Sequence, residues 1–254
     1  MSELPTSHRS HDYLRLIKRW QALAKKTGLT FNSFVEVNEL PVYYFSTASG
    51  AEDEREVIYL SAGIHGDEPA PPWGLLEWAE ANKKLLKSQR FLIFPTLNPH
   101  GIILNTRADH RGVDLNRAFN QEADPLIVAW KEVVKGLKFS LALCLHEDYD
   151  GQGCYLYELA PRGDAVGHDL LNDCASVIPP DLRKNIDGRA AKTGLILRRR
   201  IPELPGYPEA IVLQRQGCPK VFTFESPSEF SLQDRIAVQH VFVAAALKRV
   251  LGIS

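Results

Sequence analysis

The chain has 254 residues, of which 44% are hydrophobic and 24% are charged, so it holds enough apolar material for one sizeable core. Its 30 basic and 31 acidic residues leave a formal net charge of -1 at pH 7. This balance excludes the strong field by which proteins attract nucleic acid or an anionic membrane. No apolar run approaches the roughly 20 residues that span a bilayer, and the polar N-terminus has no apolar signal core. We expect one domain over residues 1–254, a cytoplasmic location, and a small molecule or short peptide as partner.

The first half of the chain alternates helix and strand signals. Apolar residues at helical spacing predict a helix over 12–26, which the stop signal Gly28 ends. Prolines at 69, 71 and 72 suit the first turn of a second helix, which continues to residue 78. Further expected elements are strands over 34–37, 42–46, 57–62 and 91–94, a charged hairpin connection over 48–55, and a helix over 125–134.

The second half continues the alternation. The apolar run 140–145 is typical of a central strand covered on both faces. We also expect helices over 164–177 and 232–251 and strands over 195–199 and 220–224. The segment 178–217 is the least regular and is expected to shape a substrate site, whereas its arginine run 198–200 is read as a solvated sheet edge. Together these elements predict an α/β three-layer sandwich, with a central mixed, mostly parallel twisted sheet flanked by helices.

A His-Gly-Asp-Glu turn follows the strand predicted at 57–62. His65 and Glu68 offer an imidazole nitrogen and a carboxylate oxygen, which are both ligands that zinc accepts. A catalytic zinc site uses three protein ligands and leaves a fourth position for water. The turn therefore predicts a zinc site whose third ligand comes from elsewhere in the chain.

Two more apolar runs end in polar residues that fill the missing roles. His146 follows the run 140–145, and Glu225 follows the strand predicted at 220–224. Ligands of open α/β sheets bind outside the carboxyl ends of strands, so these side chains are expected to meet the His65 turn in one crevice. We expect His146 to be the third ligand of a single zinc ion and Glu225 to shuttle the proton of the attacking water.

The order of these motifs resembles the zinc carboxypeptidase superfamily, including the succinylglutamate desuccinylase and aspartoacylase relatives that deacylate amino acids. The resemblance is carried by His65-Gly66-Asp67-Glu68, by Gly112-Val113-Asp114-Leu115-Asn116-Arg117, by His146 and by Glu225. It covers most of the chain, from Tyr59 to Glu225. It implies the carboxypeptidase-like fold and a zinc-dependent hydrolase.

The resemblance also implies roles for residues around the metal. Arg107 matches the arginine that stabilises the oxyanion, and Asn116 with Arg117 matches the pair that clamps a substrate carboxylate. Tyr207 is the best-placed match for the tyrosine that closes over the substrate, with Tyr155 and Tyr157 as alternatives.

Some nearby polar residues are given other roles. The family turn is Asn-Pro-Asp-Gly, whereas this chain has His100 in the third place, and we read His100 as structural. Asp148 and Asp150 follow His146 and suggest a second metal, but three ligands already complete one zinc site. We expect one of these two carboxylates to orient a ligand histidine instead.

The expected activity is zinc-dependent cleavage of an amide bond adjacent to a free carboxylate in a short or cell-wall-derived peptide. One alternative is an N-acyl amino acid deacylase of the succinylglutamate desuccinylase/aspartoacylase type. An alternative of another class is a catalytically silent carboxylate-binding module. The sequence leaves open the substrate side chain and the oligomeric state, and it places the specificity pocket between residues 188 and 217.

Overall fold

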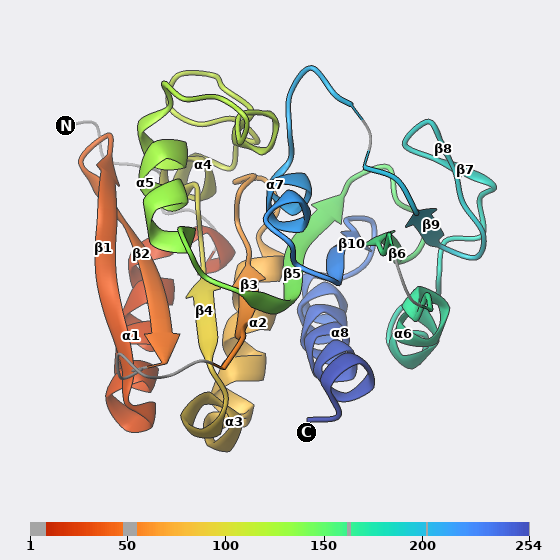
Figure 1. Cartoon of the computed structure of the whole chain (residues 1–254), viewed down its shortest axis with the longest axis horizontal. Coiled ribbons are helices and arrows are strands. Elements are labelled where there is room, and N and C mark those ends of the chain that lie inside the picture. The colour runs from red at the N-terminus through yellow and green to blue at the C-terminus, as the bar shows by residue number, and fades with distance from the viewer. Residues whose placement is uncertain (1–8, 48–54, 162–163, 202, 254) are drawn as a thin grey trace.

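The protein is described by a computed structural model that covers residues 9–47, 55–161, 164–201 and 203–253. Its centre is an eight-stranded sheet with the strand order β1-β2-β4-β3-β5-β10-β6-β9 (Figure 1). The strands are β1 (Leu29–Val37), β2 (Leu40–Thr47), β3 (Val57–Ser61), β4 (Phe91–Phe94), β5 (Phe139–Asp148), β6 (Tyr155–Leu159), β9 (Leu195–Arg198) and β10 (Val221–Pro227). Strands β4, β3, β5 and β10 run parallel to one another. The antiparallel pairs are β1 with β2, β2 with β4, and β6 with β10, whereas β9 pairs parallel to β6.

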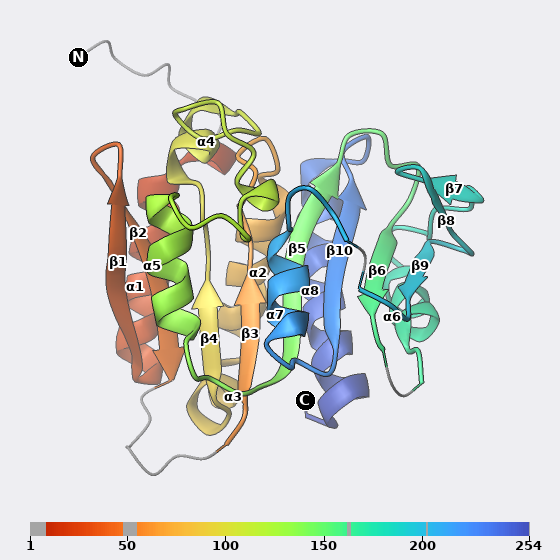
Figure 2. The same cartoon turned by 45° about the horizontal axis from the view of Figure 1, so that its top comes forward.

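Helices cover both faces of this sheet, as Figure 2 shows. One face carries α1 (Tyr13–Thr27), α2 (Ala70–Ala81), α3 (Lys83–Ser88), α6 (Gly167–Cys174) and α8 (Leu232–Leu251). The other face carries α5 (Pro125–Val134) and α7 (Glu209–Arg215). The remaining elements are α4 (Pro99–Leu104), the short 3-10 turns η1 (Arg9–His11) and η2 (Leu115–Arg117), and the hairpin β7 (Asn185–Ile186) and β8 (Arg189–Ala190). The expected three-layer α/β fold is confirmed.

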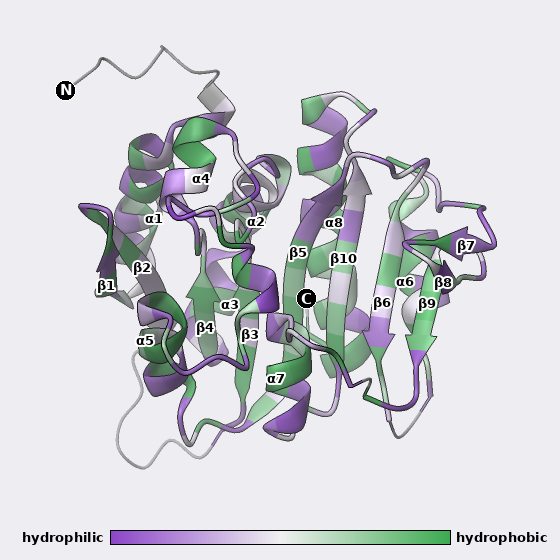
Figure 3. Cartoon of the chain, turned by 90° about the horizontal axis from the view of Figure 1, so that it is seen from above, coloured by the Kyte–Doolittle hydropathy of each residue, from purple (hydrophilic) through white to green (hydrophobic). Residues whose placement is uncertain are grey.

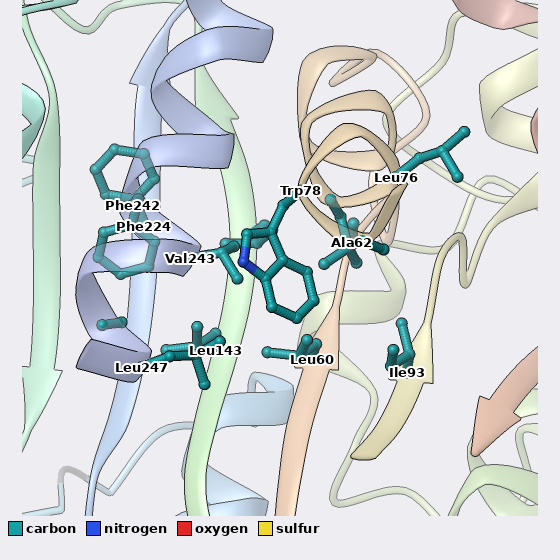
Figure 4. Packing of buried hydrophobic residues seen from close by; sticks show 14 of the residues in the cluster. Leu60, Ala62, Leu76, Trp78, Ile93, Leu143, Phe224, Phe242, Val243 and Leu247 are labelled. Atoms are coloured by element: carbon teal, nitrogen blue, oxygen red, sulfur yellow. The ribbon is translucent and has the colours of Figure 1, made fainter. Parts of the chain in front are cut away.

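The larger core lies between the sheet and the layer of α2 and α8. Trp78 of α2 is fully buried and points toward the side chains of β3 and β5 (Figure 4). Phe224 of β10 stacks on Phe242 of α8 with ring centroids 4.1 Å apart. Burying an aromatic side chain of this size contributes several kcal/mol, so α2 and α8 fix the strands that carry the site.

The carboxyl end of β5 is polar although most of the strand is apolar. Figure 3 shows β5 hydrophobic along its body and hydrophilic near its arrowhead, where His146, Glu147 and Asp148 lie. No helix in the described part of the chain is long and apolar enough to cross a membrane.

Several expected elements differ in extent. The helices expected at 125–134 and 232–251 have the expected bounds, but α6 begins only at Gly167. The buried Glu158 carboxylate accepts the backbone N–H groups of Val166 and Gly167, and this fixes where α6 starts. The hairpin expected over 48–55 is wrong, because β2 pairs with β4 and not with β3; residues 48–54 themselves lie outside the described residues.

Strands β5 and β10 are longer than expected, because each includes a polar residue that was expected to follow it. His146 lies within β5 and Glu225 within β10, where the two residues are register partners. Glu225 also pairs with Tyr155 of β6, so β10 is held on both sides up to the site. The sequence patterns did not predict β6, α4 or α7.

Candidate metal and catalytic site

The turn from residue 65 to 68 is pressed against the segment that carries α4. A Cβ atom on Gly66 would lie 1.8 Å from the Gly101 carbonyl carbon, so only glycine fits there. The Gly66 N–H donates to the Thr106 carbonyl oxygen at 3.0 Å. This contact fixes the turn directly after β3 and aims His65 and Glu68 toward the end of β5.

His65, Glu68 and His146 form a compact, buried triad. Their exposed fractions are 2%, 4% and 2%, and one possible ligand atom from each lies within 4.8 Å of the others. His65 Nδ1 is 2.5 Å from Glu68 Oε1, and His146 Nδ1 is 3.0 Å from Glu68 Oε2. Two imidazoles and one carboxylate are the donor set of a catalytic zinc site, so these residues fit the ion that the sequence predicts.

His65 and Glu68 shift each other's pKa. Burial opposes the charged form of His65, but the Glu68 charge and the hydrogen bonds to Asp114 and Glu68 raise its pKa to about 9. Burial likewise opposes ionisation of Glu68, yet the two histidines hold the pKa of its carboxyl well below the usual range. A metal ion that binds here must therefore displace a proton from the triad.

Asp114 orients the first histidine, which the sequence analysis did not foresee. Its Oδ1 lies 3.1 Å from His65 Nε2, and its Oδ2 accepts from Arg107 Nη2 at 3.1 Å. Neither Asp148 nor Asp150 plays the part expected of it, because the described side-chain partners of His65 and His146 are Glu68, Asp114 and Asn116; Asp148 accepts from the Tyr155 hydroxyl at 2.9 Å. A carboxylate on the outer nitrogen fixes the ring and leaves Nδ1 for the metal.

Replacing Asp114 by Asn is expected to weaken metal binding at the triad roughly 10- to 100-fold, the usual effect of losing a residue that orients a ligand. The neutral amide removes the charge that stabilises the His65 ring. Competition titration with a chelator measures the change. Asp150→Asn, another carboxylate in the same cleft, is the control. Equal affinities for the Asp114 variant and the wild type would contradict this role.

Asn116 and Arg117 lie beside the triad on η2. Asn116 Oδ1 accepts from the Glu209 N–H at 3.1 Å, and its Nδ2 lies 3.4 Å from His146 Nε2. Arg117 donates from Nη1 to the Asn116 carbonyl oxygen at 2.9 Å. The Asn116 amide is thus oriented by the first residue of α7.

Glu209 is a second residue that the sequence patterns missed. Its carboxylate is buried and accepts from Ser61 Oγ at 2.5 Å and from the Tyr59 hydroxyl. Burial raises the pKa of Glu209, although these hydrogen bonds oppose the shift. The contacts tie the start of α7 to β3, and this positions the N–H that holds Asn116.

Glu225 faces the triad from the neighbouring strand. Burial is the main cause that raises the pKa of its carboxyl, and the Glu68 and Asp148 charges add to it, whereas His146 and Arg107 oppose it. A carboxylate with a raised pKa is a stronger proton acceptor near neutral pH, and a general base needs this property.

A cleft of about 670 Å³ opens over these residues. It is lined by all but one of the predicted site residues, namely His65, Glu68, Arg107, Asn116, Arg117, His146 and Glu225. Tyr207 is not among the residues that line the cleft: its hydroxyl donates to Glu203 Oε2 at 2.8 Å, and its ring lies under the Arg215 guanidinium at 4.4 Å. The adjacent residues Gly206 and Pro208 line the cleft instead, so the backbone turns the tyrosine away.

The alternative tyrosines and His100 have separate positions. Tyr155 and Tyr157 both line the cleft, with the Tyr157 hydroxyl donating to Asp187 Oδ2 at 2.8 Å. His100 lies outside the cleft lining, with its ring 5.8 Å from that of His110.

A buried His-Glu-His triad at the carboxyl end of a mixed sheet, with a carboxylate facing it, defines the class of metallohydrolases. Comparison with known proteins agrees with this class. A family model described as the succinylglutamate desuccinylase/aspartoacylase catalytic domain matches residues 54–165, which carry the triad, Arg107, Asn116 and Arg117 but not Glu225. No curated protein matches the sequence.

Solved structures with the same fold cover nearly the whole chain. A protein of Shewanella amazonensis with a provisional metallopeptidase assignment is 21% identical, with a TM-score of 0.83 over 95% of this chain and 94% of its own. A similar protein of Shewanella denitrificans is 20% identical, with a TM-score of 0.84 over 96% and 92%. A metallo-carboxypeptidase of Burkholderia cenocepacia is 14% identical, with a TM-score of 0.69 over 96% and 70%. These matches confirm the carboxypeptidase-like fold that the sequence predicts.

Proposed function

We propose that this protein is a zinc-dependent, carboxypeptidase-like hydrolase that cleaves an amide bond adjacent to a free carboxylate in a short or cell-wall-derived peptide. The observation that carries the proposal is the buried triad of His65, Glu68 and His146 in one cleft with Glu225 and Arg117. We propose that the enzyme acts in the cytoplasm and binds one zinc ion per chain.

The residues divide the chemistry among them. His65, Glu68 and His146 would hold zinc, which when bound supplies Lewis acidity and a water of lowered pKa. Glu225 accepts the proton of the attacking water and returns it to the leaving nitrogen. Arg107 lies 3.6 Å from Glu68 through Nη1, close enough to the triad to stabilise negative charge on the substrate oxygen.

Arg117 and Asn116 select the substrate through its free carboxylate. A guanidinium offers two parallel hydrogen bonds to a carboxylate, and the Asn116 amide is held in place by the Glu209 N–H. Recognition of the terminus aligns the neighbouring amide bond with the triad. This alignment supplies the positioning part of catalysis.

A deacylase of N-acyl amino acids is the second candidate function. It is favoured by the family match, since that family model describes desuccinylase and aspartoacylase catalytic domains. Both reactions leave an amino acid with a free carboxylate, so the same Arg117 contact serves either one. They differ only in the group on the other side of the amide bond.

Parallel assays separate these functions. Purified zinc-loaded protein is offered blocked dipeptides with a free carboxyl terminus and the N-acetyl and N-succinyl derivatives of the same amino acids. Cleavage of the peptides supports the carboxypeptidase reading, and cleavage of the acyl derivatives alone would reject it in favour of the deacylase. A protein that binds no zinc and cleaves neither set would be a carboxylate-binding module.

Replacing Arg117 by Gln is expected to lower kcat/KM roughly 100-fold for substrates with a free carboxylate, because two charge-assisted hydrogen bonds are lost. The same peptides with an amidated terminus should be cleaved slowly by both proteins and lose little further activity. Steady-state kinetics on the two series provides the measurement, with Arg15→Gln on the exposed face of α1 as the charge-matched control. An equal loss of kcat/KM on the amidated peptides would show that Arg117 does not bind the substrate carboxylate.

A further inference from the structure

Helix α2 begins two residues after Glu68 of the triad, and its start depends on a single backbone donor. Three of the four residues over 69–72 are prolines, which carry no N–H, so only Ala70 can donate a backbone hydrogen bond there. The Glu147 carboxylate accepts this N–H through Oε2 at 2.5 Å. A carboxylate at a helix N-terminus also interacts favourably with the helix dipole, so Glu147 fixes where α2 begins.

Glu147 holds Glu68 directly as well. Its backbone N–H donates to Glu68 Oε2 at 3.1 Å. Glu147 therefore contacts the short segment from Glu68 to Ala70 at both ends, once through its N–H and once through its carboxylate. These two contacts restrict the orientation of the Glu68 side chain, and a metal site needs ligands that are held in this way.

The Glu147 carboxylate is itself held by an arginine of α8. The Glu147 side chain is fully buried, and its Oε1 accepts from Arg235 Nη1. The Arg235 side chain is only 14% exposed. Burying a carboxylate without an opposing charge is costly, so the arginine is the contact that keeps Glu147 in place beside α2.

A close crossing of α2 and α8 brings these groups together. A Cβ atom on Gly74 of α2 would lie 2.4 Å from Gln239 Cβ of α8, so only glycine allows this approach. Arg235 lies four residues before Gln239 on α8, and Ala70 lies four residues before the crossing glycine on α2. Residues four apart share a helix face, so the crossing turns both toward Glu147.

We propose that Glu147, held by Arg235, is a positioning residue for the ligand Glu68, so that metal affinity depends on a contact made by α8. The inference rests on the proposed function, in which the triad holds zinc. Glu147 then does for Glu68 what Asp114 does for His65. Arg235 lies outside residues 54–165, so the match to the family model does not imply this pair.

Metal titration separates positioning from charge alone. Glu147→Gln removes an anion near the triad and Arg235→Met removes a cation, so charge alone would weaken zinc binding in the first variant and strengthen it in the second. Positioning predicts weaker binding in both variants, roughly 10- to 100-fold in a competition titration of zinc with a chelator. Arg235→Lys keeps the cation and should recover most of the affinity.

A matched ion pair controls for loss of stability. Glu158 and Lys220 pair at 3.4 Å with side-chain exposures of 0% and 17%, close to the 0% and 14% of the proposed pair, and neither lines the cleft. Lys220→Met should lower the melting temperature of the metal-free protein without changing its zinc affinity. The visible spectrum of Co²⁺ bound in place of zinc, which reports ligand geometry, should change in Glu147→Gln and stay the same in Lys220→Met.

Kinetics at saturating zinc gives a further readout. Glu147→Gln should show a lower kcat at an unchanged KM, because Arg117 still binds the substrate carboxylate. Wild-type zinc affinity in both variants, or tighter binding by Arg235→Met, overturns the inference and leaves the proposed function intact. Weaker zinc binding in both variants of a protein that cleaves neither peptides nor acyl derivatives supports the positioning role and overturns the proposed function.

Discussion

Replacing Glu225 by Gln is expected to lower kcat by about 10²- to 10⁴-fold, the range by which a positioned general base accelerates a reaction. The amide matches the carboxylate in shape but cannot accept the proton of the attacking water. Glu225 is not one of the three residues that converge as metal ligands, so the variant should still bind zinc. Substrate affinity should change little, because the carboxylate contact belongs to Arg117.

The measurement combines steady-state kinetics with metal analysis of the same protein sample. Glu132→Gln, an exposed glutamate of α5 paired with Lys135, is the matched control and should retain wild-type kcat. Full activity in the Glu225 variant would reject the proposed mechanism. Loss of zinc from that variant would show instead that Glu225 supports the metal site.

The pH dependence gives an independent view of the same group. Burial, together with the Glu68 and Asp148 charges, raises the pKa of Glu225, and only its ionised form can act as a base. The rate should therefore rise with pH, and the acidic limb should lie above the ordinary glutamate value near 4.3. The residual activity of Glu225→Gln should lack this limb.

Much of the fold could be predicted because long helices and buried strands have a recognisable pattern of apolar residues. The helix over 232–251 buries one stripe of apolar residues against the sheet, and the strand at 91–94 is uniformly apolar because both faces are covered. Strand β6 escaped prediction because its sequence alternates two tyrosines with a leucine and the buried Glu158, which pairs with Lys220. Only its neighbours β10 and β9 make that segment a strand.

Site residues at the ends of strands could be predicted from the sequence. The direction in which a side chain points could not. His65, Glu68 and His146 follow or end apolar runs, and the parallel sheet brings such ends together. The position of Tyr207 in the sequence relative to Glu225 does not indicate where its ring points. The backbone pairing of Tyr207 with Ala118 decides the direction of the ring. Glu209 reaches Ser61 across 148 residues, so no local pattern reveals it.

Removing one metal ligand of the triad is expected to affect metal binding and activity as strongly as replacing Glu225 affects kcat. Structural zinc sites bind with roughly 10–16 kcal/mol shared over four ligands, so losing one ligand costs about 2.5–4 kcal/mol, or roughly 10²- to 10³-fold in affinity. His146→Ala should therefore lose zinc and hydrolase activity together. It should also lose the rise in thermal stability that excess zinc gives the wild type, since a ligand stabilises only the state that binds it. His168→Ala, an exposed histidine of α6, should behave like the wild type.

Zinc binding should also release a proton, because the pKa of His65 is raised to about 9 in the metal-free protein. Its charged form stabilises the metal-free fold below pH 6.5, and this contribution is lost as the pH rises through about 9. Zinc needs the neutral ring, so the apparent affinity should fall about tenfold for each pH unit below that value. Calorimetry in two buffers of different ionisation enthalpy counts the proton. Binding at pH 7 without proton release would contradict this prediction, because it would show that His65 is already neutral and that its contact with Glu68 is a hydrogen bond from an uncharged imidazole.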